Sequence, residues 1–259
     1  METIDYISSI ERQDHILYLI EQRQRLTVTD LCALFSISEA TARRDLEVLA
    51  GQGKLQRVHG GAISLRQAPP EIPILQRATE QAEEKQRIGR VVAGMIQSGE
   101  TIFLGSGTTV VEVARNLRLH KDLTVITNSL PVVNVLVDLP QITVISLGGE
   151  LRNSELSFIG HITEQSLSEV RADKVIIGIR ALSIEQGLTN DYLSETMTDR
   201  AILNIGREVI IVADHTKLGR VSTAYVAPLT NIHKLVTEQK APDDFISALR
   251  SLGIQVITC

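Results

Sequence analysis

The sequence predicts two parts of different fold class: a small α+β domain of short helices followed by a β-hairpin, and a larger α/β domain with a mainly parallel sheet. Helical periodicity and polar capping residues dominate residues 9–66. From residue 83 to residue 259, continuous Val/Ile runs alternate with helical patterns. Residues 67–82 contain Pro69, Pro70 and Pro73 and are expected to form a linker between the two domains.

The N-terminal domain begins with two predicted helices. Ile10, Leu17 and Ile20 share one face of the first helix and are expected to pack inward. Thr27 or Thr29 caps a second, shorter helix.

A third helix, from Ser38 as N-cap to about Ala50, is amphipathic. Its apolar face consists of Ala42, Leu46 and Leu49. Arg43 and Arg44 lie on the opposite face, so we expect this helix to expose two arginines.

A β-hairpin follows the third helix. Residues 54–58 alternate as a strand does, and His59-Gly60-Gly61-Ala62 predicts a tight turn, as at the tip of a wing. The chain carries a net charge of −5, yet residues 36–66 hold five basic residues, Arg66 among them, against three acidic ones. The basic charge is therefore local, where phosphate binding would need it.

The C-terminal domain is expected to contain a mainly parallel sheet covered on both faces, because its strands are continuously apolar. The predicted strands are Thr101–Leu104, Leu123–Thr127, Ile142–Ser146, Lys174–Ile179, Val209–Ala213, Lys234–Thr237 and Ile254–Ile257. Helical patterns such as Thr108–Arg118 and Pro131–Asp138 fall between most of them.

The third helix carries the residue types of a DNA recognition helix. Short polar side chains at its start can reach base edges, and arginines can contact guanine or phosphate. The residues that fit this role are Ser38, Glu39, Thr41, Arg43 and Arg44. The alternative, from the helix alone, is an amphipathic helix whose arginines are merely solvated.

A Gly/Ser/Thr turn, Gly105-Ser106-Gly107-Thr108-Thr109, joins a predicted strand to a helix. Backbone N–H groups at a helix start favour anions, so the turn is a candidate phosphate cradle. The alternative is an ordinary strand–helix turn. A nucleotide P-loop is excluded because no Gly-Lys-Ser/Thr follows, and a dinucleotide fingerprint is excluded because Val110 replaces its third glycine.

Two motifs together resemble the DeoR-type bacterial regulators. Arg43-Arg44-Asp45-Leu46 matches the family's recognition helix, and Arg57-Val58-His59-Gly60-Gly61-Ala62 matches its wing. The resemblance continues through Glu71, Pro73 and Arg77 and, further on, through Gly107-Thr108-Thr109, Thr127-Asn128-Ser129, Leu147-Gly148-Gly149, Glu195 and Asp214-x-x-Lys217. It covers nearly the whole chain.

The resemblance implies a winged helix-turn-helix that binds operator DNA, with Arg57 and His59 of the wing on the DNA backbone or minor groove. It also implies a sensor domain similar in fold to ribose-5-phosphate isomerase and the CoA-transferases, which binds a sugar phosphate or related metabolite. The implied effector-binding residues are Gly105, Ser106, Gly107, Thr108, Thr109, Thr127, Asn128, Gly148, Gly149, Asp214 and Lys217. Asp45 is expected to orient an arginine or to cap locally.

The chain departs from the family pattern at three places. Gly105 replaces an acidic residue, Arg180-Ala181-Leu182 replaces an Asp-Gly pair, and Asp199 stands where a basic residue is common. These departures concern the sugar-facing part of the expected site more than the phosphate-facing part.

The expected protein is a cytoplasmic homodimer or homotetramer without a cofactor, a catalytic residue or a metal site. Cys32 and Cys259 are far apart, no apolar run approaches the length of a membrane span, and no leader pattern is visible at the start. The rival hypothesis is a sugar-phosphate isomerase or transferase with an accessory helical domain, in which Asp214 and Lys217 act as acid and base.

Overall fold

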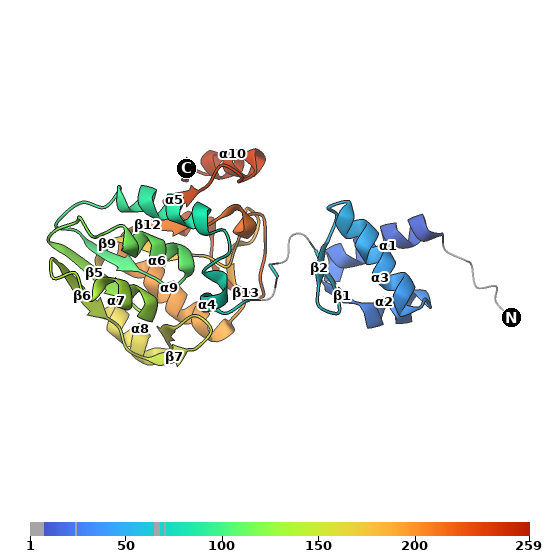
Figure 1. Ribbon diagram of the computed structural model, residues 1–259, viewed down its shortest axis with the longest axis horizontal. Helices are drawn as coiled ribbons and strands as arrows, with labels where there is room; N and C mark the ends of the chain where they lie inside the picture. Colours follow the sequence, from blue (N-terminus) through green and yellow to red (C-terminus); the bar gives the residue numbers. More distant parts are fainter. Residues whose placement is uncertain (1–7, 24, 65–67, 70) are drawn as a thin grey trace. The chain divides into compact units, whose positions relative to one another are not determined.

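The computed structural model describes residues 8–23, 25–64, 68–69 and 71–259 (Figure 1). The chain divides into two compact units, Met1–Pro69 and Pro70–Cys259. Arg66 and Gln67, at the expected boundary between domain and linker, and Pro70 within that linker lie outside the described residues.

In its described residues, the first unit is an α+β fold with three helices and a small antiparallel sheet, as predicted. Its elements are α1 (Ser9–Arg23), β1 (Arg25–Thr27), α2 (Val28–Phe35), α3 (Glu39–Gly51), β2 (Gln56–Val58) and β3 (Gly61–Ile63). The strand order is β1-β3-β2. Thr27 caps α2 by accepting from the Asp30 N–H at 3.0 Å, while the Asp30 carboxylate accepts from the Thr27 N–H.

The two faces predicted for α3 are confirmed. Ala42, Leu46 and Leu49 are buried in the core of this unit, and Arg43 and Arg44 are exposed. Ile10, expected on the inner face of α1, is instead 71% exposed. Ile10 lies in the first turn of α1, whereas the core of the unit takes up Ile16 and Ile20.

A buried ion pair ties α1 to α3. Asp45 is 3% exposed and accepts from Arg12 Nε at 2.6 Å and from Gln13 Nε2 at 3.1 Å. Asp45 therefore orients an arginine, the first of the two roles expected for it, and links α3 to α1.

The β2–β3 hairpin turns at His59 and Gly60, where Gly60 has a φ of 76°. Gly61 lies so close to β1 that a Cβ atom there would stand 2.2 Å from the Leu26 carbonyl oxygen. Only glycine permits this approach, which holds the wing against β1.

The second unit contains a seven-stranded sheet in which every neighbouring pair of strands is parallel. Its strands are β4 (Thr101–Leu104), β5 (Leu123–Thr127), β6 (Ile142–Ser146), β9 (Ala172–Gly178), β12 (Gly206–Val212), β14 (Lys234–Thr237) and β15 (Gln255–Thr258), in the order β15-β14-β12-β9-β4-β5-β6. The strand order thus reverses between β4 and β9, which places a crevice at the carboxyl ends of these two strands.

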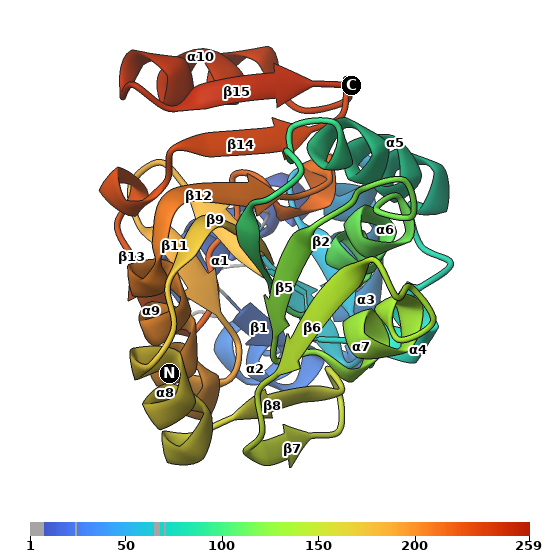
Figure 2. The ribbon, with the colours of Figure 1, turned by 90° about the vertical axis from the view of Figure 1, so that its left-hand side faces the viewer.

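The inner strands of the sheet are buried on both faces. Val175 and Ile177 of β9 belong to one apolar cluster, whereas Ile176 belongs to the other. The helices that cover the sheet are α5 (Ala82–Ala93), α6 (Thr108–Arg115) and α7 (Leu130–Leu136) on one face, and α8 (His161–Ser168), α9 (Thr196–Ile205) and α10 (Asp243–Ser251) on the other (Figure 2). Burial on both faces explains the continuous Val/Ile strands and confirms the predicted α/β class.

Smaller elements surround the carboxyl ends of the strands. An antiparallel sheet consists of β10 (Ala181–Ser183), β11 (Gly187–Asn190) and β13 (Ala224–Ala227), and a hairpin of β7 (Glu150–Arg152) and β8 (Ser157–Ile159). Three short 3-10 helices lie at Leu193–Glu195, His215–Lys217 and Leu229–Asn231.

Residues 71–77, the segment that follows the unit boundary, pack against the rest of the second unit. It includes α4 (Ile74–Arg77), whose Ile74 is 3% exposed and donates its N–H to the Ser154 carbonyl at 2.8 Å. Most of the described part of the segment expected as a linker is therefore held against the α/β unit.

We predict that replacing Asp45 by Ala weakens the packing of α3 on α1 by about 2 kcal/mol, because Arg12 loses its buried partner. Amides of α1 and α3 should then exchange with solvent roughly 30-fold faster in hydrogen-exchange mass spectrometry of the full chain. Glu47→Ala, at an exposed position of the same helix, is the control. Equal exchange rates in both variants would contradict a role for the ion pair.

Candidate nucleic-acid interface and effector cavity

The first half of α3 gathers the residues expected to read DNA. Ser38 is the N-cap of the helix, and its Oγ accepts from the Thr41 N–H at 3.3 Å. Arg43 donates from Nη2 to Glu39 at 3.3 Å, with both side chains more than half exposed. Such a pair contributes little to stability and leaves the guanidinium available to a stronger anion.

The wing presents the other two expected residues. Arg57 is half-buried on β2 and donates from Nη1 to the Gly61 carbonyl at 3.2 Å, across the hairpin. His59 is exposed at the turn. Together with the exposed Arg43 and Arg44, this unit therefore carries cationic side chains on both its third helix and its wing.

The second unit contains a cavity of about 260 Å³ at the carboxyl ends of β4, β5, β9 and β12. Of the residues expected to bind an effector, those that line it are Gly105, Ser106, Gly107, Thr108, Thr109, Asn128, Asp214 and Lys217. They come from positions more than a hundred residues apart, and the reversal of strand order brings them together.

The β4–α6 turn supplies one wall of this cavity. Gly107 directly precedes α6 and has a φ of 108°, a backbone conformation that is strained for any residue with a side chain. The first N–H groups of a helix have no partner within the helix, so this turn directs donors toward the cavity.

Three expected residues, Thr127, Gly148 and Gly149, are not part of the lining that the structure describes. Thr127 is fully buried and accepts from the Ser129 N–H at 3.0 Å. The Gly148 carbonyl accepts from Thr163 Oγ1 at 2.7 Å, and a Cβ on Gly149 would collide with the same hydroxyl. These contacts place the three residues in the adjoining turns, and their expected part in effector binding stays a prediction.

Two lysines lie near the Gly-rich turn. Burial lowers the pKa of Lys217 and that of Lys85, and in both cases the nearby Asp214 carboxylate opposes the shift. Lys85 donates from Nζ to the Arg77 carbonyl at 2.8 Å and also to the Glu80 carbonyl. Asp214 is 2% exposed and accepts from the Thr216 N–H at 3.0 Å.

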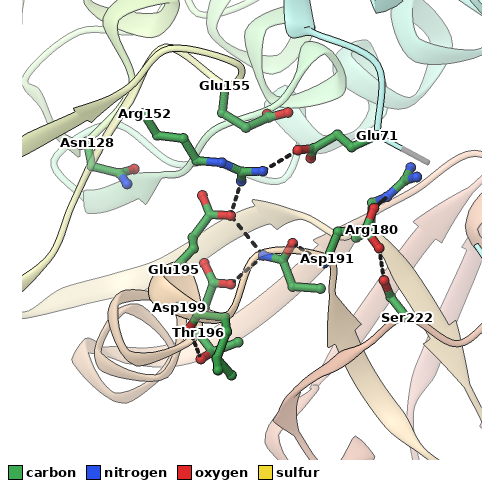
Figure 3. A network of polar contacts seen from close by, with 12 residues as sticks. Glu71, Asn128, Arg152, Glu155, Arg180, Asp191, Glu195, Thr196, Asp199 and Ser222 are labelled. Carbon is green, nitrogen blue, oxygen red and sulfur yellow. Dashed lines mark hydrogen bonds and ion pairs between the residues drawn. The ribbon is translucent and has the colours of Figure 1, made fainter.

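A second set of cavity-lining residues forms a network of carboxylates and arginines (Figure 3). Arg152 forms ion pairs with both Glu71 and Glu195. Arg77 pairs with Glu155. Glu71 and Arg77 belong to the segment that follows the unit boundary, so this segment supplies part of the cavity wall.

Asn190 connects two of the acids. Its Nδ2 donates to Glu195 Oε2 at 2.9 Å and to Asp199 Oδ2 at 2.8 Å. Burial, reinforced by Glu195, raises the pKa of Asp199 to about 8, although the hydrogen bond from Asn190 opposes the shift. Burial likewise raises the pKa of Glu195 and that of Glu155, the latter to about 8.

This network was not among the predicted site residues. Glu71, Arg77 and Glu195 stood in the motifs shared with the family, and Asp199 was noted as a departure from them. Arg180, another departure, also lines the cavity, where its Nε donates to Asp191 at 2.5 Å. The signal that could have revealed the network is that polar residues of the shared family motifs recur at positions far apart in the sequence.

Within the described part of the chain, no cluster of His, Cys, Asp and Glu is suited to hold a metal ion. None of the helices described there has the length and apolar content to span a bilayer.

Comparison with known proteins gives matches over both units. The family model for the DeoR-like helix-turn-helix domain matches residues 12–68, and that for the DeoR C terminal sensor domain matches residues 80–239. Among solved structures, ribose 5-phosphate isomerase A from Methanocaldococcus jannaschii is similar over 54% of this chain and 55% of its own, with 16% identity and a TM-score of 0.39.

Two relatives are similar over nearly their full length. The transcriptional repressor AccR of Agrobacterium fabrum is 36% identical over 233 residues, which cover 89% of this chain and 90% of that protein. The glycerol-3-phosphate regulon repressor of Escherichia coli K12 is 34% identical over 249 residues, covering 96% and 98%. The chain belongs to the DeoR family of transcriptional regulators, with a helix-turn-helix domain followed by a sensor domain.

Proposed function

We propose that this protein is a cytoplasmic transcriptional repressor that binds operator DNA through α3 and the wing and responds to a small phosphorylated metabolite. The observation that carries the proposal is that exposed arginines and a cavity lie on different units. One exposes Arg43 and Arg44 on a short helix, and the other holds a polar cavity at the reversal of its strand order. The two relatives described above are both named as repressors.

DNA recognition follows from the exposed face of α3. Arg43 and Arg44 donate to base edges or phosphates in the major groove, with Glu39 and Thr41 beside them, and Arg57 and His59 contact the backbone or minor groove. A homodimer or homotetramer presents its helices to successive major grooves of one duplex.

The effector's phosphate group is assigned to residues 105–109. The amides at the start of α6 and the hydroxyls of Ser106, Thr108 and Thr109 are donors for it, and Lys85 and Lys217 supply positive charge. Asn128 and Asp214 line the same cavity and are assigned to other groups of the effector. Asp214 and Lys217 thus serve binding here; their use as an acid and base in a sugar-phosphate isomerase is the rival function, and the names of the relatives favour a repressor.

Coupling between effector and DNA is assigned to the segment after the unit boundary. Glu71 lies just beyond that boundary, and its ion pair with Arg152 forms part of the cavity wall. An effector that competes for Arg152 or reinforces its pairs changes how firmly the segment is held. That change shifts the population of winged-helix arrangements that can bind DNA.

The DNA-binding assignment predicts that Arg43→Ala and Arg44→Ala each weaken binding by about 1–3 kcal/mol, because each removes a side chain able to form a bidentate pair with a base. Affinity is measured by gel shift on a duplex that the wild-type protein has selected from a random pool. Arg207→Ala, which removes an arginine 88% exposed on the other unit, should bind as the wild type does. Unchanged affinity in both α3 variants would refute the recognition helix.

The effector assignment predicts that Thr108→Glu abolishes the response to phosphorylated sugars while DNA binding persists, because a carboxylate at the start of α6 repels phosphate. An effector at a hundredfold excess over its Kd stabilises the wild type by about 2.7 kcal/mol. The corresponding rise in melting temperature, measured by thermal shift, should be absent in Thr108→Glu. Thr143→Glu, on an exposed position of β6, should keep the shift. If the effector shifts the melting temperature of the Thr108 variant as much as that of the wild type, the phosphate does not bind at residues 105–109.

A further inference from the structure

In the carboxylate-lined part of the cavity, four acids, Glu71, Glu155, Glu195 and Asp199, share two arginines. Arg152 is shared by Glu71 and Glu195, and Arg77 is engaged by Glu155. The described contact of Asp199 is the neutral amide of Asn190, and none of the described cations forms an ion pair with it. Asp199 is half-buried and lines the cavity, so a ligand in the cavity can contact it.

An independent acceptor faces the same cavity. Asn128 is 3% exposed and lines the cavity, and its Nδ2 donates to the Phe158 carbonyl at 2.9 Å, which fixes the orientation of the amide. Its Oδ1 is buried and has no hydrogen-bond partner among the described residues. A buried acceptor without a partner is costly, and a donor from a bound ligand satisfies it.

We infer that the effector is an amino-substituted sugar phosphate whose ammonium group lies against Asp199 and Glu195. This inference rests on the proposed function, because it assigns the phosphate of the same molecule to the Gly105–Thr109 turn. The cavity then has two chemically distinct parts, one that donates to an anion and one that accepts from a cation.

An ammonium group fits these acceptors better than a hydroxyl group. It carries three donors and a positive charge, whereas a hydroxyl brings one donor and no charge. Burial raises the pKa of Asp199 to about 8, so without a cation this acid holds its proton at neutral pH. A bound ammonium compensates the ionised carboxylates in surroundings where charges interact strongly.

Matched pairs of ligands test the inference by isothermal titration calorimetry on the full-length wild-type protein. Glucosamine 6-phosphate is compared with glucose 6-phosphate, and galactosamine 6-phosphate with galactose 6-phosphate. In at least one pair the amino sugar should bind about tenfold more tightly or better. N-Acetylglucosamine 6-phosphate, which keeps the nitrogen but loses its charge, should show no such advantage over glucose 6-phosphate.

The preference should depend on Asp199. In Asp199→Asn the affinities of the amino and hydroxyl members should approach each other, whereas Asp138→Asn, at an exposed position outside the cavity, should keep the wild-type ratio. Equal or tighter binding of the hydroxyl sugars by the wild type overturns the inference but leaves a phosphate-binding sensor standing. Absence of binding by every phosphorylated sugar, with sulfate and phosphate also inert, overturns both.

Discussion

The ion pairs of Arg152 with Glu71 and Glu195 are the interaction that joins the wall of the cavity to the start of the second unit. Arg152 lies on a hairpin, Glu195 immediately before α9, and Glu71 on the segment that leaves the unit boundary, so one guanidinium joins three separate parts of the chain. A buried arginine left without its carboxylates is strongly unfavourable. Any ligand that alters these pairs therefore changes the contacts of residues 71–77 and of the cavity wall at the same time.

The parallel sheet explains why the cavity lies where it does. Because β4 pairs with both β5 and β9, the turns after these strands diverge and leave space between them. The β4–α6 turn fills one side with backbone donors, and the acids of α9 and the preceding 3-10 helix stand among the other lining residues. The same topology that buries the Val/Ile strands thus produces a site with opposite polarity in its two parts.

Much of this architecture follows from local patterns. The bounds of β4, β5, β6 and β14 match the predicted runs. For β4, β5 and β14 the reason is that largely buried strands of a parallel sheet are nearly continuously apolar, whereas β6 is an edge strand that keeps the Val/Ile pattern although it is partly exposed. The exposed arginines of α3 follow from helical periodicity. In contrast, the Arg152 network joins residues that are far apart in the chain and share no local period. The described cavity lining does not include Thr127, Gly148 and Gly149, and a local pattern cannot say in advance whether a residue at a strand end faces the crevice or the adjoining turn.

Effector binding and the ordering of the segment after the unit boundary are, in our proposal, one physical event. Hydrogen exchange on the full chain, with and without the phosphorylated sugar that gives the largest thermal shift, tests this directly. We expect slower exchange both in residues 105–111 and in residues 71–77. Protection of the first region with no change in the second would show that the cavity binds its ligand without engaging the segment, and would contradict the account.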